Sequence, residues 1–136
     1  MGERERGASL VEFALIVPLL TLFLFGIVQF GLAYDKKQSI NSAAREGART
    51  AAIPTNTVSD VEAAVENSFQ GLIDGTVTTT VMVGATTYTS GQEPCDGNAG
   101  QTVVVESHVD HELTIPFFGA PVLDLQGRGE FRCERA

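Results

Sequence analysis

The sequence predicts an α+β fold, in which one long N-terminal helix precedes a short helix and a small antiparallel β-sheet. Three observations support this class. An apolar block runs from Leu10 to Ala33. A stripe of small residues at helical spacing follows it as far as Pro54. After residue 76 the chain is dominated by β-branched or alternating segments, which are typical of strands. The 136 residues have room for one small domain and one additional segment.

The apolar block, LVEFALIVPLLTLFLFGIVQFGLA, is long enough to cross a membrane. Its 24 residues would extend about 36 Å as a helix, and a bilayer core is about 30 Å thick. Glu12 is its only ionisable residue and Gln29 its only amide. Residues 54–136 are too few to cover such a helix on all sides, so we expect a transmembrane segment rather than a core helix.

A removed secretory signal peptide is the main alternative to a permanent span. Arg4 and Arg6 would form its charged region, and Gly31 and Ala33 are small residues suited to cleavage before Tyr34. However, the apolar region of a signal peptide has about 7–15 residues, which is shorter than this block. The chain would then be a secreted soluble domain. A single-span membrane receptor or enzyme is the other alternative.

Charge and cysteine content exclude several classes of function. The formal net charge is −8, which disfavours a nucleic-acid or phospholipid-headgroup surface that depends on basic patches. Two cysteines are too few for a four-cysteine zinc site but allow one disulfide. No nucleophile, phosphate-binding or zinc-protease motif occurs in a fitting context, so we expect neither an enzyme nor a cofactor.

The order of residues around Gly7 suggests proteolytic processing. In RERGASLVEFALIVPLL, a short charged leader precedes Gly7, and Glu12 is the fifth residue after the glycine. This pattern resembles the site at which a prepilin peptidase cleaves type IV prepilins. The motifs GASLVEFALIVP, FGIVQFG and AAREGARTAA, in this order, resemble the TadE-like family of tight-adherence (Flp, type IVc) pilus systems. The resemblance is dense over residues 7–52 and looser at the end, LDLQGRGEFRCER.

The resemblance implies a pilin-like architecture in four parts. These are a leader (1–7), a transmembrane helix (8–34), its extracytoplasmic continuation (35–53) and a small α+β extracytoplasmic domain (54–136). It implies a minor pilin or pseudopilin with a structural or assembly role in the inner membrane. The implied partners are the prepilin peptidase, the major pilin, other pseudopilins, the assembly platform and membrane lipid, with no nucleic acid and no metal.

Cleavage between Gly7 and Ala8 would free an ammonium group one helical turn from Glu12. An ionised carboxylate in hydrocarbon costs about 2.5–3.5 kcal/mol, so Glu12 should be protonated, shallow or paired. By analogy with pilins, pairing with the ammonium of a neighbouring subunit would set the register during assembly. A shallow position, where the charge suits the helix dipole, is the other interpretation. The sequence leaves both open.

Three further residues of the span are candidates for bending and packing. Pro18 removes one helical hydrogen bond and tends to kink a helix. Gly26 and Gly31 allow a second helix to approach closely.

Topology signals conflict. Arg4 and Arg6 precede the span, whereas Lys36, Lys37, Arg45 and Arg49 follow it, and this count alone places the C-terminal side in the cytoplasm. Insertion of similar prepilins with the leader inside, and a cysteine pair suited to an oxidising compartment, favour the opposite orientation. We therefore expect the N-terminus inside and the domain outside.

In the remaining chain, the long helix should continue to Pro54 and bury the stripe formed by Ile40, Ala43, Ala44, Gly47, Ala48, Ala51 and Ala52. Its opposite side should carry Lys36, Lys37, Asn41, Arg45 and Arg49. A second helix is predicted from Ser59, as N-cap with Glu62, to residue 73. Its buried face should contain Val61, Ala64, Val65, Phe69, Leu72 and Ile73.

Strands are predicted over residues 76–83, 102–115 and 128–135. In the second, Val103, Val105, Val109, Leu113 and Ile115 should face the core, opposite Thr102, Glu106, His108, Asp110, Glu112 and Thr114. The third should alternate Glu130, Arg132 and Glu134 with Phe131 and Cys133. The apolar segment IPFFGAPV before it is either a core cover or a contact patch.

Two sets of side chains could carry chemistry in the domain. In HVDH, His108 and Asp110 share a strand face while His111 points to the other, so the set cannot converge on one metal ion. Cys95 and Cys133 are expected to form a disulfide, with free buried thiols as the alternative. The bridge would close a loop of about 38 residues and contribute roughly 3–4 kcal/mol.

Overall fold

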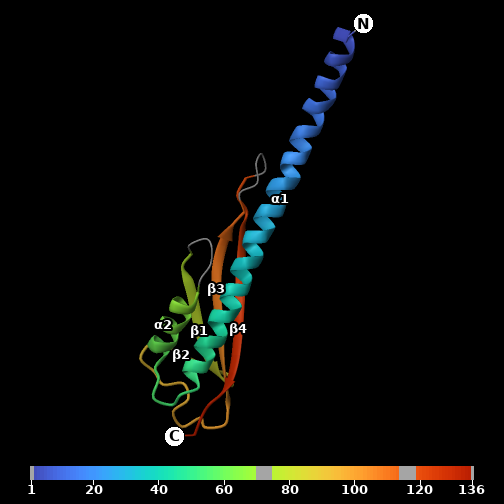
Figure 1. Cartoon of the computed structure of the whole chain (residues 1–136). Helices are drawn as coiled ribbons and strands as arrows, with labels where there is room; N and C mark the ends of the chain where they lie inside the picture. Colours follow the sequence, from blue (N-terminus) through green and yellow to red (C-terminus); the bar gives the residue numbers. More distant parts are fainter. Residues whose placement is uncertain (1, 70–74, 114–118, 136) are drawn as a thin grey trace.

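The computed structural model describes residues 2–69, 75–113 and 119–135, and it shows the expected α+β fold (Figure 1). The elements in chain order are α1 (Gly2–Ala51), α2 (Val58–Ser68), β1 (Val77–Val83), β2 (Thr86–Tyr88), β3 (Thr102–Glu112) and β4 (Val122–Arg132). The second half of α1 packs on the sheet, and its first half projects away from the domain (Figure 1).

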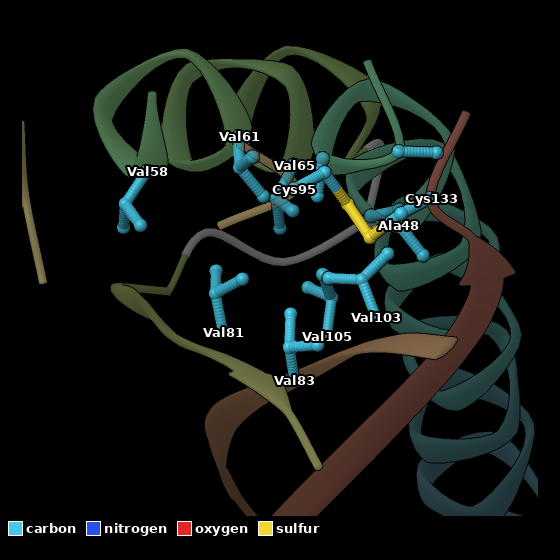
Figure 2. Close-up of a cluster of buried hydrophobic side chains, with 13 residues drawn as sticks. Ala48, Val58, Val61, Val65, Val81, Val83, Cys95, Val103, Val105 and Cys133 are labelled. Carbon is cyan, nitrogen blue, oxygen red and sulfur yellow. A yellow bond between two sulfur atoms is a disulfide. The ribbon is translucent and has the colours of Figure 1, made fainter. Parts of the chain in front are cut away.

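The four strands form one antiparallel sheet in the order β2–β1–β3–β4. In the centre of the register, Val105 of β3 pairs with Val81 of β1 and with Gly129 of β4. Strand β2 was not predicted, because it is only three residues long. Both helices cover the same face of the sheet, so the core lies in one layer between them and the strands (Figure 2).

The predicted small-residue stripe of α1 is buried against the sheet and α2, as expected. Gly47 is a point of close packing, since a Cβ at this position would collide with the side chain of Val65 and meet Val105 at 3.3 Å. One assignment was wrong: Lys36 is 1% exposed and lies on the sheet side of α1. Its aliphatic stem is covered, and its Nζ donates a hydrogen bond to the main-chain carbonyl of Asp110 at 2.9 Å.

Strand β4 begins earlier than predicted, at Val122 instead of residue 128, and ends at Arg132. The inward positions of its centre are Leu125, Gly127 and Gly129, so two glycines conceal the alternation of apolar side chains. A Cβ on Gly129 would lie 2.6 Å from the carbonyl carbon of Ala44. A Cβ on Gly127 would lie 2.6 Å from that of Ile40. The backbone of α1 therefore rests directly on the backbone of β4.

The start of α2 also differs from the prediction. Thr57, not Ser59, is the N-cap, and its partner in the capping box is Asp60, not Glu62. The Thr57 main-chain N–H donates to the Asp60 carboxylate at 2.9 Å and holds its pKa below the ordinary value. Val58, Val61 and Val65 form the buried face. The structure ends α2 at Ser68, and Leu72 and Ile73 lie outside the described residues.

Strand β3 alternates as predicted, with Val103, Val105 and Val109 buried. Leu113 is half-buried, whereas Thr114 and Ile115 lie outside the described residues. The same inward row contains the buried residues Ser107 and His111. Among the described residues, neither ring nitrogen of His111 has a hydrogen-bond partner. Burial lowers the pKa of this imidazole, and the Lys36 ammonium lowers it further, so His111 is neutral in the core at neutral pH.

The main core consists of valines from α2 and the sheet, the buried alanines at the end of α1 and one disulfide. Figure 2 shows the valines of α2 facing those of β1 and β3, with the Cys95–Cys133 bridge beside them. The two Cα atoms are 5.3 Å apart, and both residues are buried. The bridge ties the loop before β3 to the residue that follows β4. It therefore closes the end of the sheet next to the C-terminus of α1.

We predict that Gly129→Ala destabilises the fold by about 1–3 kcal/mol, because the new methyl group must displace α1 from β4. Chemical denaturation of the full chain in detergent measures the loss. Gln126→Ala is the control, since this exposed side chain lies on the opposite face of β4 and should cost under about 0.5 kcal/mol. Equal stability of Gly129→Ala and the native chain would contradict the close approach.

We also predict that the disulfide contributes about 3–4 kcal/mol, mainly by restricting the unfolded chain. Reduction should lower the melting temperature of the native chain but leave a Cys95→Ser/Cys133→Ser double variant unchanged. Thiol labelling of denatured, unreduced protein should detect no free thiol. Labelling of both cysteines in protein from its native host would contradict both the bridge and an oxidising location for the domain.

Candidate functional site

The first half of α1 is the most unusual surface of the molecule. Between Leu10 and Phe30, its large apolar side chains are exposed on every side of the helix, with Leu15 and Phe30 both 74% exposed. A continuous apolar surface of this size is not stable in water and marks a membrane or protein contact. The helix is long and apolar enough to cross a membrane. This segment is therefore the candidate functional site.

The structure places Gly7 inside the helix, because α1 already begins at Gly2. The Gly7–Ala8 bond therefore has helical geometry. Space around Gly7 is open, since a Cβ there would meet no atom within 4 Å. Glycine is about 1 kcal/mol less favourable than alanine in a helix interior, so the helix is weakened at this position. A protease would need to unwind only this weak point.

Glu12 is exposed on the same segment and is its only acidic side chain between Leu10 and Ala33. Residues four apart in a helix lie on one face, about 6 Å apart along the axis. Ala8 and Glu12 have this spacing in α1. The backbone nitrogen of Ala8 and the Glu12 residue therefore lie on one face of one helix.

Pro18 lies within α1, which continues through it without interruption from Gly2 to Ala51. The Thr21 hydroxyl donates to the Val17 carbonyl at 2.8 Å in the same turn. Near the end of the apolar half, a shallow apolar hollow is lined by Leu22, Phe23, Gly26, Ile27 and Phe30. Neither Gly26 nor Gly31 would bring a Cβ within 4 Å of another group. Both glycines leave room for a second helix.

Two lysines at the junction of the two halves were not recognised as important from sequence. Lys36 binds the main-chain carbonyl of Asp110 in β3, and Lys37 donates to that of Gln126 in β4. These two hydrogen bonds connect α1 to two neighbouring strands just after the end of its apolar half. Their position directly after the apolar block was the one sequence feature that could have indicated this role. A sequence does not show which backbone carbonyls a lysine side chain reaches.

The HVDH segment does not converge on one point. His108 lies on the outer face of the sheet, where its Nδ1 is 3.3 Å from the carboxylate of Asp124. His111 is buried on the inner face. Nearby on the outer face, Arg128 forms ion pairs with Glu130 at 2.7 Å and Glu106 at 3.4 Å. The outer row is therefore a solvated, paired surface, as its sequence indicated.

Comparison with known families agrees with the location of this site. The family described as TadE-like protein matches residues 7–49, which is about a third of the chain and includes the exposed half of α1 and most of its packed half. No curated protein and no solved structure matches the chain. The similarity therefore concerns α1.

Proposed function

We propose that this chain is a minor pilin or pseudopilin of a tight-adherence (Flp, type IVc) pilus, which acts by helix packing and not by catalysis. One observation carries the proposal. The segment similar to TadE-like proteins contains an exposed apolar half-helix with a single carboxylate, five residues after a glycine in a weak turn. An anchor alone would need neither that carboxylate nor its spacing.

In this proposal the apolar half of α1 spans the inner membrane with the N-terminus in the cytoplasm. The buried disulfide supports an extracytoplasmic domain, because such bonds persist in oxidising compartments. The basic residues after the span have less weight than their number suggests. Lys36 and Lys37 bind carbonyls of the sheet, so they serve the fold of the domain and are a weaker indication of a cytoplasmic side.

The proposed assembly step begins with cleavage after Gly7 by a prepilin peptidase. The new ammonium group of Ala8 on one subunit then pairs with Glu12 of the same or an adjacent subunit, which removes an isolated charge from hydrocarbon. The hollow around Gly26 accepts a helix of the major pilin or of another pseudopilin, with the assembly platform holding the subunits in the membrane.

N-terminal sequencing of the mature protein distinguishes this function from its alternatives. Ala8 as the first residue supports a processed pseudopilin. Tyr34 as the first residue would indicate a secreted domain, and an intact leader would indicate a plain membrane anchor. Cleavage before Tyr34 would remove the buried Ala33 from the domain and leave the buried Lys36 near the new N-terminus.

We predict that Gly7→Val blocks processing, since a β-branched side chain hinders access to the scissile bond. Mass spectrometry after co-expression with a prepilin peptidase should show a shortened native chain and a full-length variant. Gly2→Val is the matched control, because it alters a glycine of the same leader away from the bond and should be cleaved. A Gly7→Val variant that is shortened as efficiently as the native chain would refute the site.

We predict that Glu12→Ala is cleaved and inserted normally but fails to support normal pilus yield. Removal of the only ionisable group between Leu10 and Ala33 should ease insertion, so a defect would have to arise in assembly. Glu12→Asp should be intermediate, since it keeps the charge on a shorter side chain. Pilus yield is compared at matched levels of processed protein. Native yield from cleaved Glu12→Ala would leave Glu12 as a shallow surface residue without a register role.

A further inference from the structure

The end of the sheet that points toward the apolar half of α1 carries exposed apolar residues. Val122 is 59% exposed and Leu123 is 41% exposed, and Gly119, Ala120 and Pro121 before them are also exposed. The Leu113 main-chain N–H donates to the Pro121 carbonyl at 2.9 Å, so the pairing of the two chain segments continues through Pro121. We refer to residues 119–123 as the apolar end of β4.

This end reaches farther along α1 than the other described parts of the sheet or α2 (Figure 1). The contacts at the glycines give the register, because Gly127 lies on Ile40 and Gly129 on Ala44. Two strand residues span about 6.6 Å and four helical residues about 6 Å, so α1 and β4 advance together in the same direction. The hydrogen bond from Lys37 to the Gln126 carbonyl fits the same register.

The register can be extended from Gly127 back to Val122. Five strand residues span about 17 Å, which equals about eleven residues of helix. Val122 therefore lies at the level of Gln29, and Pro121 lies about 3 Å beyond it. Both are alongside the apolar block, which ends only at Ala33.

The thickness of a bilayer then places this end of the sheet. If the span enters hydrocarbon at Leu10, a core of about 30 Å is crossed in about twenty residues and ends near Gln29. Val122 lies at this boundary, and Pro121 lies inside it. A domain seated on α1 in this register cannot keep the apolar end of β4 in bulk water.

We propose that the apolar end of β4 inserts into the outer interface of the bilayer as a second membrane contact. The partner is lipid at the boundary of headgroups and acyl chains, a depth of about 5–10 Å that apolar side chains of peripheral proteins reach. The inference rests on the membrane span of the proposed function. It needs no basic patch, because apolar side chains make the contact, and so it agrees with the acidic composition.

Charged residues limit the depth of insertion. Glu112 pairs with Val122 across the strands, and Asp110 pairs with Asp124 two residues farther from the tip. Each is exposed, and an ionised carboxylate is costly inside hydrocarbon. The domain therefore settles with Glu112 among the headgroups. Two contacts, α1 and β4, then fix its tilt relative to the membrane.

Tryptophan fluorescence tests the insertion directly, because the native chain has no tryptophan. Three single variants of the full chain are reconstituted in phosphatidylcholine vesicles with brominated acyl chains. Val122→Trp probes the apolar end of β4. Phe131→Trp is the matched control, since Phe131 is 46% exposed at the opposite end of the same strand. Phe30→Trp reports on the span itself.

We expect brominated lipid to quench the fluorescence of Val122→Trp and Phe30→Trp but not that of Phe131→Trp. In the vesicles, the emission maximum of Val122→Trp should lie at shorter wavelength than that of Phe131→Trp. Quenched Phe30→Trp with unquenched Val122→Trp would overturn this inference and leave the anchor intact. Unquenched Phe30→Trp would instead overturn the membrane span. A third outcome would also refute lipid insertion. If the emission of Val122→Trp shifts to shorter wavelength only as the protein-to-lipid ratio rises, and brominated lipid does not quench it at a low ratio, the contact is a neighbouring copy of the chain.

Discussion

The direct contact between the backbone of α1 and the backbone of β4 is the constraint on which the rest of the structure depends. Gly127 and Gly129 have no side chains to separate the two elements, and Ile40 and Ala44 lie on them from the helix. One turn later, Gly47 of α1 leaves room instead for side chains, those of Val65 in α2 and Val105 in β3. Because no free space remains between the two backbones at Gly127 and Gly129, α1 cannot slide or rotate on the sheet without a steric clash. The two junction lysines, bonded to main-chain carbonyls of β3 and β4, reinforce the same register.

This register joins two halves of one helix that suit different surroundings. The first half carries Leu, Ile, Val and Phe on all sides, as expected for a helix that faces lipid or other helices. The second half carries a narrow stripe of Ala and Gly, which brings the sheet close to the helix axis. The small stripe is fully occupied by the sheet and α2. Among the described residues of α1, the large exposed apolar side chains therefore belong to the first half, which also carries the hollow around Gly26 and the carboxylate of Glu12.

Much of the fold was predictable because its signals are local. The length of the apolar block, the spacing of Ile40, Ala43, Gly47 and Ala51, and the alternation of β3 all follow from periodicity. The errors share a different cause. Gly127 and Gly129 conceal the apolar alternation of β4, since they face a helix that lies more than eighty residues earlier in the sequence. Lys36 was assigned to the solvent side by its charge, but a carbonyl of β3 makes its burial possible. At α2, two overlapping capping patterns compete, and the chain uses Thr57 and Asp60.

The apolar half of α1 was predictable from sequence because it is one continuous segment, whereas cleavage after Gly7 and pairing of Glu12 stay predictions. Gly7, Glu12 and the apolar block are adjacent in sequence, so their relation in the helix follows from 3.6 residues per turn. What the sequence could not supply is the position of the sheet along this segment. That position depends on contacts between residues near 40 and residues near 127, and it decides which part of the domain lies level with the end of the span. The contact of α1 with β4 thus links the position of the apolar half of the helix to the position of the entire domain.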